Sequence, residues 1–189
     1  MGNVGINPRA SLLLFGHKLA ADFTQRAEGD KTMIRFARAA EEDAAELAQI
    51  QMRAFHSQNP PGFPKLSGPP GYDSVTWQIE MMKQVPYTKI IEGATIVGGL
   101  VLLPKSPTHC HVERIYLDPL CHGRGIGTQT MKWMEKTWPE YKQWTLRTPA
   151  FHVGNQRFYE GLGYLRVGER EVMPGFLMVE YEKRIGELA

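Results

Sequence analysis

The segment Gly123-Arg124-Gly125-Ile126-Gly127 restricts the possible folds of this chain more than any other feature. It follows Pro119, which ends a strand-like segment, and it leads directly into a helical pattern. Glycine at alternating positions lets the backbone turn so that several N–H groups point at one place before the helix. Together with the helix dipole, such a nest binds a phosphate group. Arg124 adds a positive charge with a planar set of donors.

The residues after this loop argue against two common classes of phosphate-binding protein. A Walker loop ends in Gly-Lys-Ser/Thr, whereas Gly127 is followed by Thr128 and Gln129. A dinucleotide fingerprint requires a third glycine three residues after Gly127, where this chain has Thr130. The spacing therefore disfavours an NTPase and an NAD-binding Rossmann domain.

Composition excludes several further classes. The chain has 189 residues, of which 42% are hydrophobic, enough for one domain with a sizeable core. The net charge of +2 is too small for a dedicated nucleic-acid binder. No apolar stretch reaches the roughly 20 residues of a membrane span. Cys110 and Cys121 lack zinc-site spacing and are too few for a disulfide framework, so we expect free thiols and a cytoplasmic location.

Hydrophobic periodicity predicts helices between strands, and hence an α/β (α+β) fold with a twisted mixed β-sheet flanked by helices. The expected strands cover 34–38, 87–92, 94–103, 109–118, 143–147, 164–170 and 175–183, and the expected helices cover 41–57, 73–84, 128–138 and 155–161. The proline-rich segment 59–71 is expected to be a loop, which either lines a site or only connects two helices. We predict one domain over 33–189. Whether 1–32 is a poorly ordered extension, an artificial leader or the result of an upstream start is left open.

Alternation along 109–118 assigns its side chains to two faces of one strand. Val112, Arg114 and Tyr116 are expected on one face, and Glu113, Ile115 and Leu117 on the other. His109, His111 and Glu113 also alternate along this strand. Since ligands on one straight strand rarely converge, we predict no metal site.

Two segments carry a resemblance to a known family. Tyr116-Leu117-Asp118-Pro119, then His122-Gly123-Arg124-Gly125-Ile126-Gly127 and a helix, resembles the acetyl-CoA-binding motif of the GNAT superfamily of N-acetyltransferases. The family motif usually begins with Gln or Arg, where this chain has His122. Phe158-Tyr159-Glu160-Gly161-Leu162-Gly163-Tyr164 is similar to the family's Phe-Tyr-Glu-x-x-Gly-Phe segment. With the first strand and helix, the resemblance spans Met33 to about Lys183.

The resemblance implies a GNAT fold, acetyl-CoA as co-substrate, and the residues that bind it. These are expected to be Ile115, Tyr116, Leu117, His122, Gly123, Arg124, Gly125, Ile126, Gly127, Thr128, Asn155 and Phe158. It also implies that Tyr159 is the acid that protonates the leaving thiolate, and that a backbone N–H, for which Leu117 is the candidate, stabilises the oxyanion. The family often has Asn seven positions before the tyrosine, where this chain has His152.

An amine acceptor requires a base. At a pKa near the ~10.4 of lysine, an amine is mostly protonated at neutral pH and cannot attack a thioester. Glu113 resembles the glutamate that many family members use as a base, often through water. The alternative interpretations are a solvated strand carboxylate for Glu113 and a core aromatic for Tyr159.

The predicted function is therefore an N-acetyltransferase that transfers the acetyl group of acetyl-CoA to a primary amine. A non-catalytic acyl-CoA-binding regulatory module, an NAD-binding oxidoreductase and a glycine turn that binds nothing are the alternatives. The acceptor is expected to be a small molecule, a peptide N-terminus or a protein lysine. We expect no nucleic-acid or membrane partner, and a homodimer is left open.

Overall fold

The computed structural model describes residues 23–26, 33–58 and 68–186. Most of the predicted extension, and residues 59–67 of the predicted loop, lie outside the described residues. The strands are β1 (Phe23–Arg26), β2 (Met33–Arg38), β3 (Tyr87–Glu92), β4 (Thr95–Pro104), β5 (His109–Leu117), β6 (Gln143–Pro149), β7 (Leu165–Met173) and β8 (Phe176–Arg184). They form one sheet in the order β1-β2-β3-β4-β5-β6-β8-β7. Every neighbouring pair is antiparallel except β5 and β6, so the predicted mixed sheet is confirmed.

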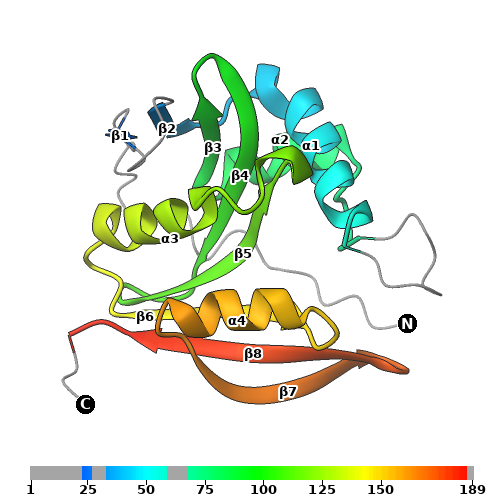
Figure 1. Cartoon of the computed structure of the whole chain (residues 1–189), viewed down its shortest axis with the longest axis vertical. Coiled ribbons are helices and arrows are strands. Elements are labelled where there is room, and N and C mark those ends of the chain that lie inside the picture. The colour runs from blue at the N-terminus through cyan, green and yellow to red at the C-terminus, as the bar shows by residue number, and fades with distance from the viewer. Residues whose placement is uncertain (1–22, 27–32, 59–67, 187–189) are drawn as a thin grey trace.

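Four α-helices cover the two faces of the sheet (Figure 1). They are α1 (Ala44–His56), α2 (Val75–Gln84), α3 (Ile126–Thr137) and α4 (Val153–Gly161), with short 3-10 turns at Glu41–Asp43 and Pro119–Cys121. α1 and α2 pack on one face around a smaller core, while α3 and α4 pack on the other around a larger core that contains Trp133 and Tyr159. Within the described residues, no helix is both long and apolar enough to cross a membrane.

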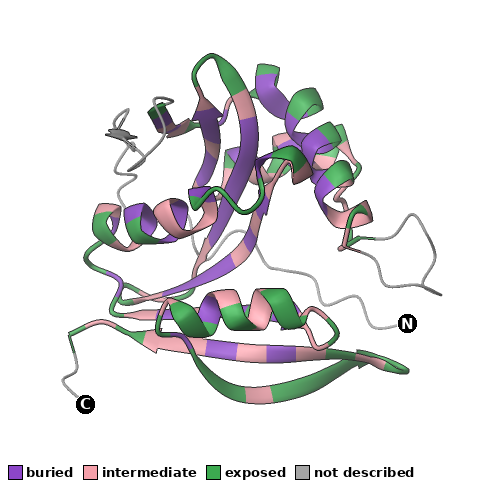
Figure 2. Cartoon of the chain, viewed as in Figure 1, coloured by how far each residue is buried: buried purple, intermediate pink, exposed green. Residues whose placement is uncertain are grey.

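The observed elements agree with the predicted ones to within a few residues, with one addition. Phe23–Arg26 lies inside the predicted extension, yet it pairs with β2 as an edge strand. Burial also differs between the centre of the sheet and its β7 edge: Figure 2 shows β4 and β5 largely buried, whereas β7 is exposed along nearly its whole length.

Two adjacent glycines allow β4 to lie close against β5. A Cβ on Gly98 would lie 2.2 Å from the main-chain oxygen of Tyr116, and a Cβ on Gly99 would lie 2.5 Å from its hydroxyl oxygen. The ring of Tyr116 therefore passes over Gly99 into the smaller core, where its hydroxyl hydrogen-bonds that of Tyr87. This contact fixes the side chains that β5 presents on either face.

A β-bulge in β5 changes the predicted faces. Val101 pairs with Arg114 and Leu102 with Val112, so Glu113 is an extra residue on β5. Val112 consequently packs into the larger core, against which Ile115 and Leu117 also pack, and its predicted grouping with Arg114 and Tyr116 is wrong.

The bulge also changes the surroundings of Glu113. Its carboxylate lies 4.0 Å from Nε2 of His111. Because Cys110 and Val112 point into the larger core, His111 between them faces the opposite side. The predicted grouping of Glu113 with Ile115 and Leu117 is therefore wrong as well.

β5 and β6 part in the middle of the sheet. They pair only over His109–Val112 and Gln143–Leu146, although β5 continues to Leu117 and β6 to Pro149. Beyond these four pairs, no strand of the described residues lies between β5 and β6 to pair with their main-chain groups. The opening lies directly before the glycine loop.

Candidate active site

A cavity of about 1060 Å³ occupies the opening between β5 and β6. Its walls are formed by the glycine loop, both parted strands, α4, the end of α1, the turn at 68–70 and the tip of the β7–β8 hairpin. Glu113, Tyr159 and all of the predicted cofactor-binding residues except Arg124 line it. One space thus contains nearly the whole site that the sequence predicts.

The glycine loop has the backbone conformation that the predicted nest requires. Gly123 and Gly125 have φ values of 73° and 76°, a left-handed conformation that only glycine adopts without strain. Gly125 is the N-cap of α3. Within the described residues, the amides of Gly123, Gly125, Ile126, Gly127 and Thr128 have no hydrogen-bond partner. These free donors at a helix N-terminus match the chemistry of a diphosphate.

The two amides that precede the nest are used within the chain. Those of Cys121 and His122 donate to the carbonyls of Asp118 and Pro119, at 2.8 and 3.2 Å. They hold the 3-10 turn that carries the loop. Nε2 of His122 lies 3.2 Å from the Leu117 carbonyl oxygen, which ties the loop back to the end of β5.

Arg124 does not face the cavity. Its guanidinium donates to the carboxylate of Glu92 on β3, at 3.0 Å from Nη1 and 2.5 Å from Nη2. The predicted contribution of Arg124 to phosphate binding therefore does not follow from its placement. The donors that face the cavity are those of the loop backbone.

α4 brings three predicted residues to the cavity wall. The ring of Phe158 lies 3.3 Å from where a Cβ on Gly127 would be, so α4 packs against the first turn of α3. Asn155 donates to Oγ1 of Thr148 on β6 at 3.3 Å and to Oε1 of Gln58 at 3.5 Å. Asn155 therefore links α4 to β6 and to the end of α1.

The phenol of Tyr159 is held in its protonated form. Its ring is buried among Phe158, Tyr164 and Tyr181. Burial raises the pKa of Tyr159 well above its ordinary value, because the charged phenolate would lose its hydration. Its hydroxyl has no hydrogen-bond partner among the described residues, so it can serve as a proton donor.

His111 and His109 contact the same side chain. Nδ1 of His111 and Nε2 of His109 each lie 2.9 Å from Oγ1 of Thr145 on β6. Burial, with the positive charge of Arg147 as the next cause, lowers the pKa of His111 to about 3. Its imidazole is therefore neutral at physiological pH, and its contact with Glu113 is not an ion pair. Among the described residues, no group of three or more His, Cys, Asp or Glu is arranged to hold a metal.

Two arginines that the sequence analysis did not select also line the cavity. Arg114 comes from β5 beyond the bulge, and Arg147 comes from β6 just past its last pair with β5. No motif marks either residue. The bulge and the parting of the strands bring both side chains to this space, so only the fold reveals them.

The class of protein follows from this arrangement. Free amides at a helix N-terminus, a gap between parted strands and a protonated tyrosine in one cavity define an acyltransferase that uses a carrier with a diphosphate. Residues 87–166 match the family model described as "Acetyltransferase (GNAT) domain". The matched region runs from β3 to the start of β7 and contains the glycine loop and Tyr159, so this part of the chain is similar to GNAT acetyltransferases.

Comparisons with individual proteins agree with this family. The chain is 26% identical over 163 residues to S-(2-succino)cysteine N-acetyltransferase of Bacillus subtilis, covering 80% of this chain and 96% of that protein. It shares the fold of PaiA N-acetyltransferase from Thermoplasma acidophilum, solved in complex with coenzyme A, with a TM-score of 0.65, 16% identity and coverage of 80% and 99%. For yncA of Salmonella typhimurium, solved with its cofactor acetyl-CoA, the TM-score is 0.61 at 11% identity, with coverage of 82% and 96%.

Proposed function

We propose that this protein transfers the acetyl group of acetyl-CoA to a primary amine by direct attack, with Glu113 as the base and Tyr159 as the acid. One observation carries the proposal: the unpartnered amides of the glycine loop, the Tyr159 hydroxyl and the Glu113 carboxylate line a single cavity. A ligand in that cavity can contact all three.

The glycine loop supplies the binding energy for the carrier. The amides of Gly123 and Gly125 to Thr128 would hold the diphosphate, and the parted edges of β5 and β6 would flank the pantetheine arm. Bound acetyl-CoA supplies an acetyl group activated as a thioester. The remaining roles belong to side chains and main-chain groups of this chain.

We assign to the amide of Leu117 the stabilisation of negative charge on the acetyl oxygen. The neighbouring amide of Asp118 donates to the Val97 carbonyl at 2.8 Å, towards β4. Since successive amides of a strand point in opposite directions, the Leu117 amide points away from β4, into the gap between β5 and β6. A donor fixed there needs no reorganisation when charge develops.

Glu113 and Tyr159 supply the two proton transfers. The Glu113 side chain is 32% exposed, which leaves room for a water between its carboxylate and an incoming ammonium group. Tyr159 holds its proton at every physiological pH and would donate it to the departing sulfur. Glu113 would accept a proton from the amine as Tyr159 gives one up.

The acceptor, the location and the assembly remain parts of this proposal. The Bacillus subtilis relative is named for N-acetylation of S-(2-succino)cysteine, which supports a small amine as acceptor. Both cysteines are free and buried, in keeping with the predicted cytoplasmic location. A homodimer stays a prediction that light scattering of the purified protein tests.

A screen of amines with acetyl-CoA tests the function. Release of free thiol is followed across amino acids, polyamines, aminoglycosides and short peptides, and coenzyme A binding is measured separately by calorimetry. We expect at least one acceptor to give steady turnover, and Tyr159→Phe to lower kcat at least 10-fold with little change in coenzyme A affinity.

Tyr141→Phe is the matched control, since Tyr141 is another buried tyrosine of the larger core and does not line the cavity. It should keep wild-type turnover. Tight coenzyme A binding without thiol release from any amine would instead identify a regulatory acyl-CoA-binding module.

A further inference from the structure

The acceptor side of the cavity has an unusual balance of charge. Among the described residues that line the cavity, Glu113 is the only carboxylate, whereas Arg114 and Arg147 are both cations. An amine that carries no negative charge would enter as an ammonium ion against this excess. The charge therefore favours an acceptor that also carries an anionic group.

Arg114 is buried, and its guanidinium hydrogen-bonds to neutral groups. Its Nη1 donates to Oε1 of Gln51 at 2.7 Å, its Nη2 to the Pro70 carbonyl at 2.5 Å, and its guanidinium lies 3.7 Å from the ring centroid of Trp77. Only 6% of the residue is exposed, and its Nε is a buried donor with no partner in the described part of the chain. A guanidinium satisfied mainly by neutral groups leaves much of its positive charge uncompensated at the cavity wall.

Arg147 is the accessible cation of the pair. It follows Leu146, the last residue of β6 that pairs with β5, so its side chain stands at the point where the strands part. The residue is exposed, and the carboxylate of its cross-strand neighbour on β8, Glu180, pairs with Arg170 at 3.3 Å. Its charge reaches the ring of His111 on β5, where it is one of the causes that lower the pKa of that ring.

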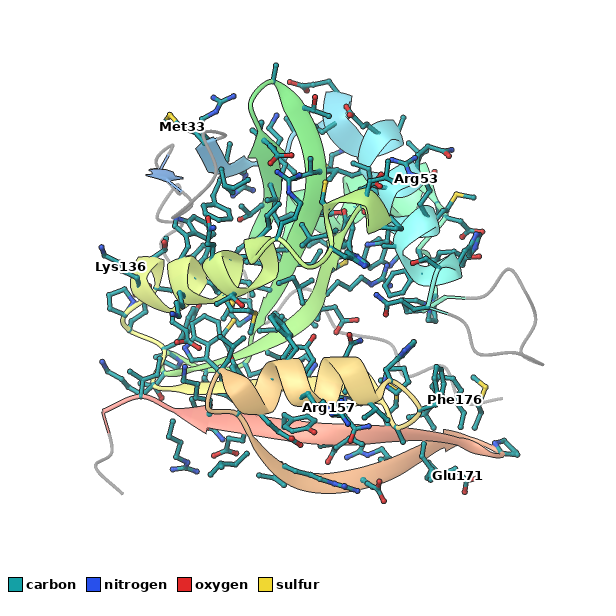
Figure 3. The ribbon with its side chains drawn as sticks, viewed as in Figure 1. Met33, Arg53, Lys136, Arg157, Glu171 and Phe176 are labelled. Atoms are coloured by element: carbon teal, nitrogen blue, oxygen red, sulfur yellow. The ribbon has the colours of Figure 1, made fainter. Side chains whose placement is uncertain are left out.

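Part of the cavity wall near the β7–β8 hairpin is apolar. The rings of Phe151 and Phe176 meet edge to face at 5.6 Å, and Met178 lies on the same wall. Figure 3 shows Phe176 at the turn end of the β7–β8 hairpin. An acceptor can thus place a hydrophobic body against the hairpin while its polar end faces β5 and β6.

From these observations we infer that the acceptor is an amino-acid-type amine, with a carboxylate next to the amine, and that Arg147 binds that carboxylate. The ammonium group then lies on the side of Glu113, and Arg114 provides a positive wall behind the polar end. This inference rests on the function proposed above and defines the substrate class of the same site.

Matched acceptor triplets test the inference. Each triplet contains an amino acid, its carboxamide and its decarboxylated amine, for example phenylalanine, phenylalaninamide and 2-phenylethylamine. We expect at least 10-fold higher kcat/KM for the amino acid in the triplets that react. Arg147→Gln should remove most of this preference by raising KM for the amino acid far more than KM for the decarboxylated amine, and Arg147→Lys should restore part of it.

Arg157→Gln is the control, since Arg157 is an exposed arginine of α4 that does not line the cavity (Figure 3). It should keep the wild-type preference. Equal kcat/KM across every reactive triplet would overturn the inference and leave the acetyltransferase function intact.

A binding measurement judges the inference even if no triplet reacts. N-acetyl amino acids and their amides are titrated against the protein with coenzyme A bound, and ligand-induced thermal stabilisation is recorded. Stabilisation by the acids alone, lost in Arg147→Gln, would support the carboxylate site. Stabilisation by neither, or equally by both, would refute it.

Discussion

The guanidinium of Arg53 on α1 donates two hydrogen bonds to the carboxylate of Asp118, just after β5. Nε lies 2.8 Å and Nη2 lies 2.6 Å from Oδ2. The other carboxylate oxygen, Oδ1, accepts the amide of Leu120 at 3.1 Å. Burial alone would raise the pKa of Asp118, but these hydrogen bonds outweigh it and hold the pKa below its ordinary value. One carboxylate thus joins a helix on one face of the sheet to the turn that carries the glycine loop.

Removal of this carboxylate should weaken coenzyme A binding. Asp118→Ala loses both the ion pair and the cap of the 3-10 turn, so we expect a loss of about 1 kcal/mol of stability and a several-fold higher Kd for coenzyme A. Asp118→Asn can still accept the Leu120 amide and should show a smaller effect. Calorimetry and urea unfolding measure both quantities.

Lys83→Ala provides the comparison for that experiment. It removes an ion pair with Glu41 in which both side chains are 58% exposed. Stability should change by less than about 0.5 kcal/mol and the Kd should stay unchanged. A Kd that is equal in Asp118→Ala and the wild type would show that the glycine loop does not depend on this anchor.

Gly98→Ala should destabilise the whole sheet. The added Cβ would lie 2.2 Å from the main-chain oxygen of Tyr116, which cannot move without separating β4 from β5. Strain of this kind costs about 1–3 kcal/mol or more, so we expect a clear fall in Tm.

Gly154→Ala is the counterpart, because nothing lies within 4 Å of its Cβ and it sits in α4. That variant should be neutral or slightly more stable; equal losses in the two proteins would contradict the close approach of β4 and β5.

Gly125→Ala should affect binding more than folding. A Cβ there meets nothing within 4 Å, but the φ of 76° strains an alanine by about 1–2 kcal/mol. The loop can relieve the strain by turning its amides away from the cavity, so we expect at least a 10-fold higher Kd for coenzyme A. Gly186→Ala is the comparison for this variant, because Gly186 has the same open surroundings and a φ of 89° but lies outside the cavity. An unchanged Kd in Gly125→Ala would count against the nest.

Acidification should destabilise the protein through His111. An unfolded histidine binds a proton near its ordinary pKa of about 6.5, whereas the folded state resists protonation of His111 until about pH 3. Between these values the unfolded state binds more protons, so stability falls as pH falls, by up to about 1.4 kcal/mol per pH unit. Burial lowers the pKa values of His109 and His152 in the same direction. Urea unfolding at several pH values should give a flatter profile for His111→Gln.

An NMR titration of His111 separates the two main causes of its lowered pKa, burial and the charge of Arg147. In Arg147→Gln the His111 ring loses a nearby positive charge, so its pKa should rise while burial keeps it below 6.5. A ring that titrates at the same pH in both proteins would place the Arg147 guanidinium away from β5.

The sequence predicted the strands, the helices and the glycine loop because each has a local cause. Proline and glycine mark the ends of elements, and alternation or helical spacing identifies the segments between them. The nest followed from the spacing of three glycines, and Tyr159 from its place in a recognisable segment. These features needed no knowledge of which strands are neighbours.

The errors arose where distant residues meet. A single extra residue at Glu113 inverts the faces on either side of it, and no residue type announces a bulge. Arg124 was predicted to contact phosphate because the sequence gives no sign of its partner, Glu92, which belongs to a strand far away in the chain. Arg147 acquires its role only because β6 separates from β5, which depends on the whole sheet.

The short pairing between β5 and β6 has a mechanical consequence. Among the residues that the structure describes, the ladder that joins β1–β5 to β6–β8 has four residue pairs. A pantetheine chain has amides of its own. In the gap between β5 and β6 it would hydrogen-bond to both strands, as a further strand does, and so connect the two parts of the sheet. The bound carrier would then stabilise the sheet as well as supply the acetyl group. Its release would leave β5 and β6 joined only by their short ladder, and the protein would be more easily deformed between these two strands.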